Sequence, residues 1–109
     1  MQIRWQCDSS RWQAILEQVP AATIFHSPAW AETYARSGRG HYEVMHAEWS
    51  DGRQAIVPVG VRPIWQSLLQ AAAVGIDGGY GGILATGRLD PDEVTALMRC
   101  LQRRIRAVT

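Results

Sequence analysis

The residues of this sequence best suited to chemistry lie in a glycine-rich stretch from residue 75 to 87, which holds most of the ten glycines. Because glycine has no side chain, its backbone lets a ligand approach closely. Asp77 could act as a base or as a polar contact to a substrate, and Tyr80 could stack on a ligand or hydrogen-bond to it. We therefore predict a substrate cleft lined by Asp77, Gly78, Gly79, Tyr80, Gly81 and Gly82.

The same stretch has a purely structural interpretation, which stays open beside the functional one. Asp-Gly and Tyr-Gly pairs, found at residues 77–78 and 80–81, are typical of tight turns that join two short strands. In that case Asp77 is a turn residue and Tyr80 packs against the sheet. Asp77 is therefore a weak candidate for catalysis, and the catalytic residues are otherwise unknown.

A second candidate arrangement is His26 beside Ser27, two residue types that can form a base and a nucleophile. Adjacent residues at the start of a helix point in different directions, and no acidic residue is placed to orient the imidazole. We therefore expect Ser27 to cap a helix that begins at Pro28, and His26 to be partly exposed.

The histidines and cysteines show no metal-binding or disulfide pattern. His41 and His46 are five residues apart, which is not a usual ligand spacing, and Cys7 and Cys100 belong to no Cys-x-x-Cys pair. We predict no metal site and two buried, reduced thiols.

Composition narrows the classes of function. The 109 residues suffice for one domain with its own core. The sequence contains no lysine, which excludes a Walker A loop, a Schiff-base lysine and a Ser-Lys dyad. A net charge of +1 gives no strong field for nucleic acid. No apolar run reaches the roughly 18 residues of a membrane span, and no signal peptide opens the chain, so we predict a cytoplasmic protein.

The first elements are predicted from hydrophobic periodicity. Residues 2–7 alternate between polar and apolar, as in a half-buried strand. The following helix has Ser10 at capping-box spacing from Gln13 and ends at Pro20. Its apolar face consists of Trp12, Ile15, Leu16 and Val19.

A second short helix is predicted from Pro28 onward. Phe25 leads into it as an extended residue, and Gly38 closes it. Trp30 and Tyr34 lie one turn apart on this helix and are expected in the core.

A β-hairpin is the clearest signal in the middle of the chain. Residues 42–49 and 54–62 are β-prone and flank an Asp-Gly pair at residues 51–52. Pro58 removes a hydrogen-bond donor from the second strand, which predicts an edge strand or a bulge. One face of that strand carries Ala55, Val57, Val59 and Val61.

Two further strands and a long helix complete the prediction. The strands cover residues 68–74 and 83–85, and the helix begins at Asp90 and Pro91. Its apolar stripe consists of Val94, Leu97, Met98, Leu101, Ile105 and Val108. Its other side carries Arg99, Arg103 and Arg106, with Arg104 on the flank. We thus predict an α/β (α+β) fold in the order β-α-α-β-β-β-β-α, with a mostly antiparallel sheet flanked by helices.

Three short motifs resemble FemAB-like proteins, which belong to the GNAT acyltransferase superfamily. Phe25, Ser27, Pro28 and Trp30 match the early Phe-x-Ser-Pro-x-Trp segment of that family. Pro58 partly matches its Gly-x-x-Pro-Leu strand, and residues 81–82 match a later Gly-Gly step. The similarity covers about residues 12 to 87.

The resemblance implies a GNAT-like domain over residues 1–109, the first half of a longer tandem protein. Members transfer an acyl or aminoacyl group to an amine, often of a cell-wall or surface-polymer precursor, which implies a bacterial chain. The donor would be acyl-CoA or aminoacyl-tRNA, held mainly by a second domain, and the sequence lacks the GNAT pyrophosphate loop. We therefore expect this chain alone to be inactive and to bind no donor by itself.

Partners follow from the same resemblance. The final helix has no glycine or proline stop signal, so we expect a missing second GNAT domain, or a second copy of the chain, to cover one face. No nucleic acid is expected beyond a transfer RNA that carries the donor group. The alternative is a non-catalytic module that binds a protein partner through a sheet edge or through the last helix.

Overall fold

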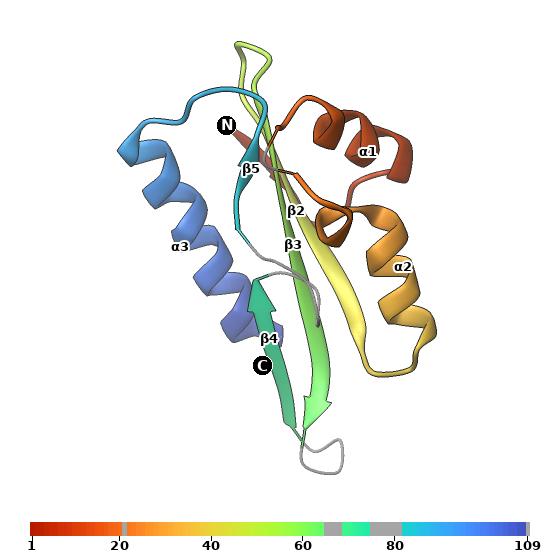
Figure 1. Ribbon diagram of the computed structural model, residues 1–109. Coiled ribbons are helices and arrows are strands. Elements are labelled where there is room, and N and C mark those ends of the chain that lie inside the picture. Colours follow the sequence, from red (N-terminus) through yellow and green to blue (C-terminus); the bar gives the residue numbers. More distant parts are fainter. Residues whose placement is uncertain (21, 65–68, 75–81, 109) are drawn as a thin grey trace.

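An antiparallel sheet between two layers of helices organises the chain (Figure 1). The computed structural model describes residues 1–20, 22–64, 69–74 and 82–108. The mixed α+β class and the antiparallel sheet are confirmed. The elements are β1 (Gln2–Arg4), α1 (Ser9–Glu17), the 3-10 turn η1 (Ile24–His26), α2 (Pro28–Arg36), β2 (His41–Glu48), β3 (Gln54–Ile64), β4 (Leu69–Val74), β5 (Leu84–Ala85) and α3 (Pro91–Val108).

The order of strands in the sheet is β1-β2-β3-β4, and β5 pairs with β3. The predicted hairpin is confirmed, because Trp49 N donates to Arg53 O at 3.0 Å and β2 pairs with β3 in one continuous register. The strand that contains Pro58 is therefore the centre of the sheet, and the prediction of an edge strand was wrong.

Pro58 is tolerated there because of how the neighbours of β3 are arranged. On the side away from β2, β5 pairs with residues 55–56 of β3 and β4 pairs with residues 60–64. Gln54 O accepts from Thr86 N at 2.8 Å, so by strand alternation the nitrogen of Pro58 faces this same side. Among the described strands none pairs with residue 58 on that side, so no ladder bond is lost.

Both faces of the sheet are buried. Figure 1 shows α1 and α2 on one face and α3 on the other. The predicted shared face of Ala55, Val57, Val59 and Val61 is confirmed, and it packs under α3. The core on the α3 side consists of Met45, Ala47, Ala55, Val57, Val59, Val61, Leu97 and Leu101. The core on the other side consists of Trp12, Ile15, Leu16, Ala31, Tyr34, Val44, Ile56 and Leu84.

The start of α1 differs from the prediction. Asp8, and not Ser10, is the N-cap, because its carboxylate accepts a hydrogen bond from Ser10 N at 3.3 Å. A carboxylate also suits the positive end of the helix dipole. The strand before it is shorter than predicted and ends at Arg4, since the chain then leaves the sheet to reach α1.

The predicted cap of α2 is confirmed, but the predicted conformation of the residues before it is wrong. Ser27 Oγ accepts from Trp30 N at 3.1 Å, and Pro28 occupies the first turn. Phe25 belongs to the 3-10 turn η1 and is not extended. Two contacts hold that turn: Thr23 N donates to His26 Nδ1 at 3.0 Å, and Trp12 Nε1 donates to His26 O at 2.9 Å.

Helix α3 begins with a reciprocal capping box. Glu93 N donates to Asp90 Oδ1 at 2.9 Å, and Asp90 N donates to Glu93 Oε1 at 3.0 Å. The predicted apolar stripe is only partly buried: Leu97 and Leu101 are in the core, whereas Val94 and Met98 are exposed at 36% and 41%.

Two arginine–glutamate ion pairs explain how α3 is rotated about its own axis. Arg53 donates to both carboxylate oxygens of Glu93, at 2.8 and 2.6 Å, and lies over the ring of Trp49. Arg104 donates to Glu43 Oε2 at 2.7 Å and lies over the ring of Trp5. Both pairs pull the Glu93 and Arg104 side of α3 toward the sheet, which turns Val94 and Met98 outward.

Acid is expected to weaken the attachment of α3. Hydrogen bonds from Arg53, and next from the backbone of Asp90, lower the pKa of Glu93 from 4.5 to about 2. A carboxylate with a lowered folded-state pKa stabilises the fold above its unfolded pKa and loses that contribution as the pH falls through the folded value. The contribution should therefore disappear between about pH 4.5 and 2.

Urea unfolding of the wild type and Glu93→Gln across this pH range measures the effect. Glu93→Gln should be the less stable protein near neutral pH, and the gap should narrow steadily as the pH falls. Asp92→Asn, at the neighbouring exposed position, is the control and should follow the wild type. A gap that does not change with pH would contradict this role of Glu93.

No helix in the described ranges is long and apolar enough to span a bilayer.

Candidate functional site

Most of the predicted substrate cleft lies outside the described residues. This applies to Asp77, Gly78, Gly79, Tyr80 and Gly81. Gly82 is described and has a φ of 123°, a backbone conformation that favours glycine just before β5. The cleft therefore stays a prediction.

His26 and Ser27 do not form a nucleophile and base pair. Ser27 Oγ donates to Ile24 O at 2.5 Å and accepts from Trp30 N, so the hydroxyl is used on both sides. His26 Nδ1 is directed at Thr23. The expectation that Ser27 is a cap is confirmed, but His26 is only 4% exposed and not partly exposed, because η1 folds its ring inward.

The other histidines and cysteines give no metal site in the described part of the chain, where no three His, Cys, Asp or Glu side chains gather. Cys7 and Cys100 are both free thiols, as predicted, although both are half-buried and not fully buried.

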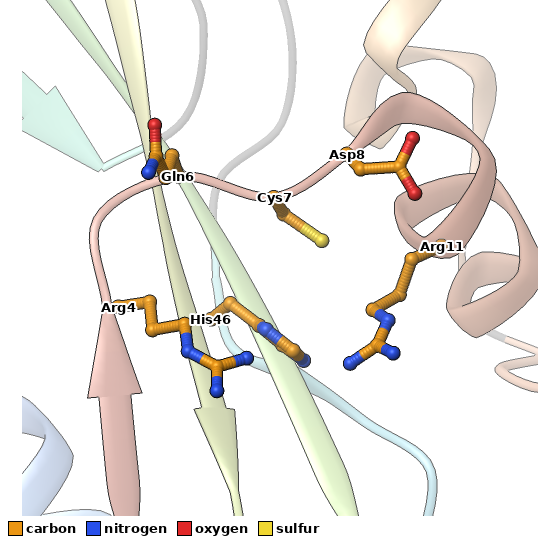
Figure 2. A pocket seen from close by; sticks show the side chains of 6 residues that line it. All are labelled: Arg4, Gln6, Cys7, Asp8, Arg11 and His46. Atoms are coloured by element: carbon orange, nitrogen blue, oxygen red, sulfur yellow. The ribbon is translucent and has the colours of Figure 1, made fainter.

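A pocket of about 510 Å³ opens where the chain passes from β1 to α1. Figure 2 shows the guanidinium groups of Arg4 and Arg11 and the imidazole of His46 on one side of it, with the thiol of Cys7 pointing toward them. Its lining consists of Arg4, Gln6, Cys7, Asp8, Arg11 and His46. We name this the β1–α1 pocket.

Local structure places each of these groups. Arg4 of β1 lies directly opposite His46 of β2 in the sheet register, so both side chains extend from the same face. Arg11 comes from the first turn of α1, which covers that face. Asp8 is fixed beside it as the cap of α1.

His46 forms a rigid floor. The residue is 2% exposed, and its Nε2 lies 2.9 Å from Gln54 Oε1. The imidazole is therefore held in one orientation by β3.

Cys7 is unsuited to nucleophilic catalysis. Burial raises the pKa of its thiol, an effect that Arg11 and Arg4 only partly oppose. Because the thiolate is the reactive form, a thiol with a raised pKa is a poor nucleophile near neutral pH. Asp8 behaves in the opposite way, since hydrogen bonds from the hydroxyl and amide of Ser10 lower its pKa and keep it ionised.

The two arginines have unused hydrogen-bonding capacity. Arg11 Nη1 lies 3.6 Å from Glu48 Oε1, which is longer than the roughly 2.7–2.9 Å of a charge-assisted hydrogen bond. Arg4 has no ion pair among the described residues. The pocket therefore offers guanidinium donors beside a buried imidazole, a set of groups better suited to hydrogen-bonding an anion than to activating a nucleophile.

Sequence reasoning missed this pocket. The polar side of the first strand, which includes Arg4, was visible in the alternation of residues 2–7. Its position opposite His46 depends on strand pairing, which that alternation does not reveal.

Comparison with known protein families, curated proteins and solved structures found no match to this chain. Its function is therefore inferred from its own residues.

Proposed function

We propose that this chain is the acceptor-side domain of a FemAB-like N-acyl- or aminoacyltransferase that acts on an amine of a cell-wall or surface-polymer precursor. In this proposal the fold is GNAT-like, with the order β-α-α-β-β-β-β-α. The donor, acyl-CoA or aminoacyl-tRNA, is held mainly by a second domain, so residues 1–109 alone are inactive.

One spatial relationship carries the proposal. β4 leads into the glycine-rich stretch and β5 follows it, and these strands pair with β3 on either side of Pro58. The chain on both sides of that stretch thus lies beside Pro58 at the centre of the sheet. This supports the proposal because Pro58 and residues 81–82 are two of the three motifs that resemble the family.

The third motif, at residues 25–30, connects the turn η1 to α2 and holds the two in place. Ser27 and Pro28 start α2, and the hydrogen bond from Trp12 Nε1 to His26 O ties the preceding turn to α1. Ser27 and Pro28, which resemble the family's segment, therefore start the helix that lies over the sheet beside α1. This layer would hold one wall of an acceptor site in place.

Binding of the acceptor amine tests the proposal. We expect a soluble cell-wall peptide with a free amine to bind this chain in calorimetric titration, and its N-acetylated form to bind at least tenfold more weakly. Asp77→Asn should weaken binding of the free amine by about tenfold, since a hydrogen bond to a charged group is worth about 1.5–3 kcal/mol. Asp92→Asn, which removes a carboxylate from the exposed start of α3, should leave binding unchanged.

Two results would contradict the proposal. The first is equal binding, or no binding, of the free and acetylated peptides. The second is a longer protein containing this chain that gives no heat with acyl-CoA and takes up no aminoacyl-tRNA. Amine binding without donor binding would favour the alternative, a non-catalytic binding module.

The partner in this proposal is a second GNAT-like domain or a second copy of the chain. Val94 and Met98 support it, because they lie one turn apart on α3 and are exposed. An apolar pair at this spacing on a helix suits packing against another surface.

A further inference from the structure

We propose that the β1–α1 pocket is a binding site for the carboxylate group of a small molecule, held by Arg4 and Arg11. The inference concerns a different site from the glycine-rich stretch and does not depend on transferase activity.

Geometry is the first reason. Arg4 projects from the edge strand β1 and Arg11 from the first turn of α1, and Figure 2 shows both guanidinium groups directed into the same space. A guanidinium has five donors in a planar fork that matches the two oxygens of a carboxylate. Two such forks beside the fixed imidazole of His46 form a receptor for one oxyanion.

Charge is the second reason. The ionised groups that line the pocket are the guanidiniums of Arg4 and Arg11 and the carboxylate of Asp8. Asp8 is already directed at the amide and hydroxyl of Ser10, where it caps α1. The two guanidiniums therefore face one lining carboxylate that is already engaged, and the next counter-charge is Glu48, which lies outside the lining at 3.6 Å from Arg11.

The contact between Arg11 and Glu48 is the third reason. Glu48 extends from β2 and lies outside the pocket lining, at 3.6 Å from Arg11. The Glu48 carboxylate is therefore attracted to Arg11 but lies too far from it for a short hydrogen bond. A ligand carboxylate can replace it at shorter distance.

The surroundings favour a monoanion over a dianion. His46 is buried and Cys7 is half-buried, which indicates a partly dehydrated floor. The cost of removing an ion from water rises steeply with its charge. A carboxylate is therefore expected to bind more tightly than inorganic phosphate.

Matched ligands test the proposal directly. N-acetyl-L-alanine carries a carboxylate, and N-acetyl-L-alaninamide is its uncharged equivalent. Titration of isotope-labelled protein at constant ionic strength should shift the amide resonances of Cys7, Asp8 and Arg11 with the first compound and not with the second. Inorganic phosphate should produce the same shifts only at higher concentration.

Substitutions of the two arginines separate the contribution of the planar guanidinium from that of its positive charge. Arg4→Gln and Arg11→Gln should each weaken binding of N-acetyl-L-alanine by about tenfold or more, since each removes hydrogen bonds to a charged group. Arg4→Lys and Arg11→Lys keep the charge and lose the fork, so they should fall between the wild type and the Gln variants. Glu48→Gln removes the competing carboxylate and should tighten binding several-fold.

Arg99→Gln is the matched control, because it removes the same charge from an exposed position on α3, which covers the opposite face of the sheet. It should leave binding unchanged. Both pocket arginines are exposed, so all variants should fold. If a Gln variant fails to fold, the Lys variant at the same position still tests the contribution of the guanidinium.

Four results would overturn the proposal: equal shifts with the acid and the amide, tighter binding of phosphate, equal loss in Arg99→Gln, or no tightening in Glu48→Gln. Failure of the peptide-amine titration at the glycine-rich stretch would leave this site unaffected, so the two proposals fail separately.

Discussion

Gly40→Ala is expected to destabilise the fold by about 3 kcal/mol or more. Gly40 links α2 to β2, and a methyl group there would lie far inside contact distance of Val61 O, 2.6 Å from Tyr34 Oη and 2.9 Å from Arg62 Cα. Two of these three atoms are backbone of the central strand, so they cannot move without breaking the sheet. Urea unfolding followed by circular dichroism would measure the loss.

Gly38→Ala is the matched control, two residues earlier in the same connection. Gly38 has a φ of 77°, and a methyl group there would meet nothing within 4 Å. Its replacement should cost only the strain of a left-handed backbone, about 1 kcal/mol. If the two variants are equally stable, the close approach of Gly40 to β3 is not a constraint on the fold.

Trp12→Ala is the second change with a large expected effect, about 3–5 kcal/mol. The side chain is 1% exposed, contributes to the core beneath α1 and α2, and lies 6.0 Å from the ring of Tyr42. Its Nε1 also donates to His26 O, so truncation leaves a buried carbonyl without its donor. The turn η1 should lose order together with the core.

Trp12→Phe separates the two contributions. It retains most of the apolar volume and removes the hydrogen bond, so we expect a loss of about 1–3 kcal/mol together with faster amide exchange at His26 and Ser27. Gln13→Ala, at the next and exposed position of α1, should change stability by less than about 0.5 kcal/mol. Unchanged exchange in Trp12→Phe would show that the indole does not hold η1.

The turn η1 connects stability to the proposed carboxylate site. It fixes α2 over the sheet face that also carries Val44 and Ile56 in its core. The β1–α1 pocket lies on the same face, where His46 extends from β2. Variants that loosen Trp12 should therefore also weaken carboxylate binding, since α1 positions Arg11.

The sequence by itself determined several local features that neighbouring residues decide. The Asp-Gly turn between β2 and β3, the Ser27 cap and the start of α3 at Asp90 and Pro91 all depend on residues within a few positions of one another. The cap of α1 was mistaken because Asp8 and Ser10 both have suitable side chains, and the ionised carboxylate at the helix start prevailed.

Tertiary structure alone decided the central position of β3, the rotation of α3 and the β1–α1 pocket. Pro58 suggested an edge, but its nitrogen faces the space between β4 and β5, which only the pairing of three strands defines. The stripe of α3 was misjudged because Arg53 and Arg104 bind Glu93 and Glu43 across 40 and 61 residues of sequence. Arg4 and His46 become neighbours through the β1–β2 register. Each outcome depends on contacts between residues distant in the chain, and local periodicity contains no information about them.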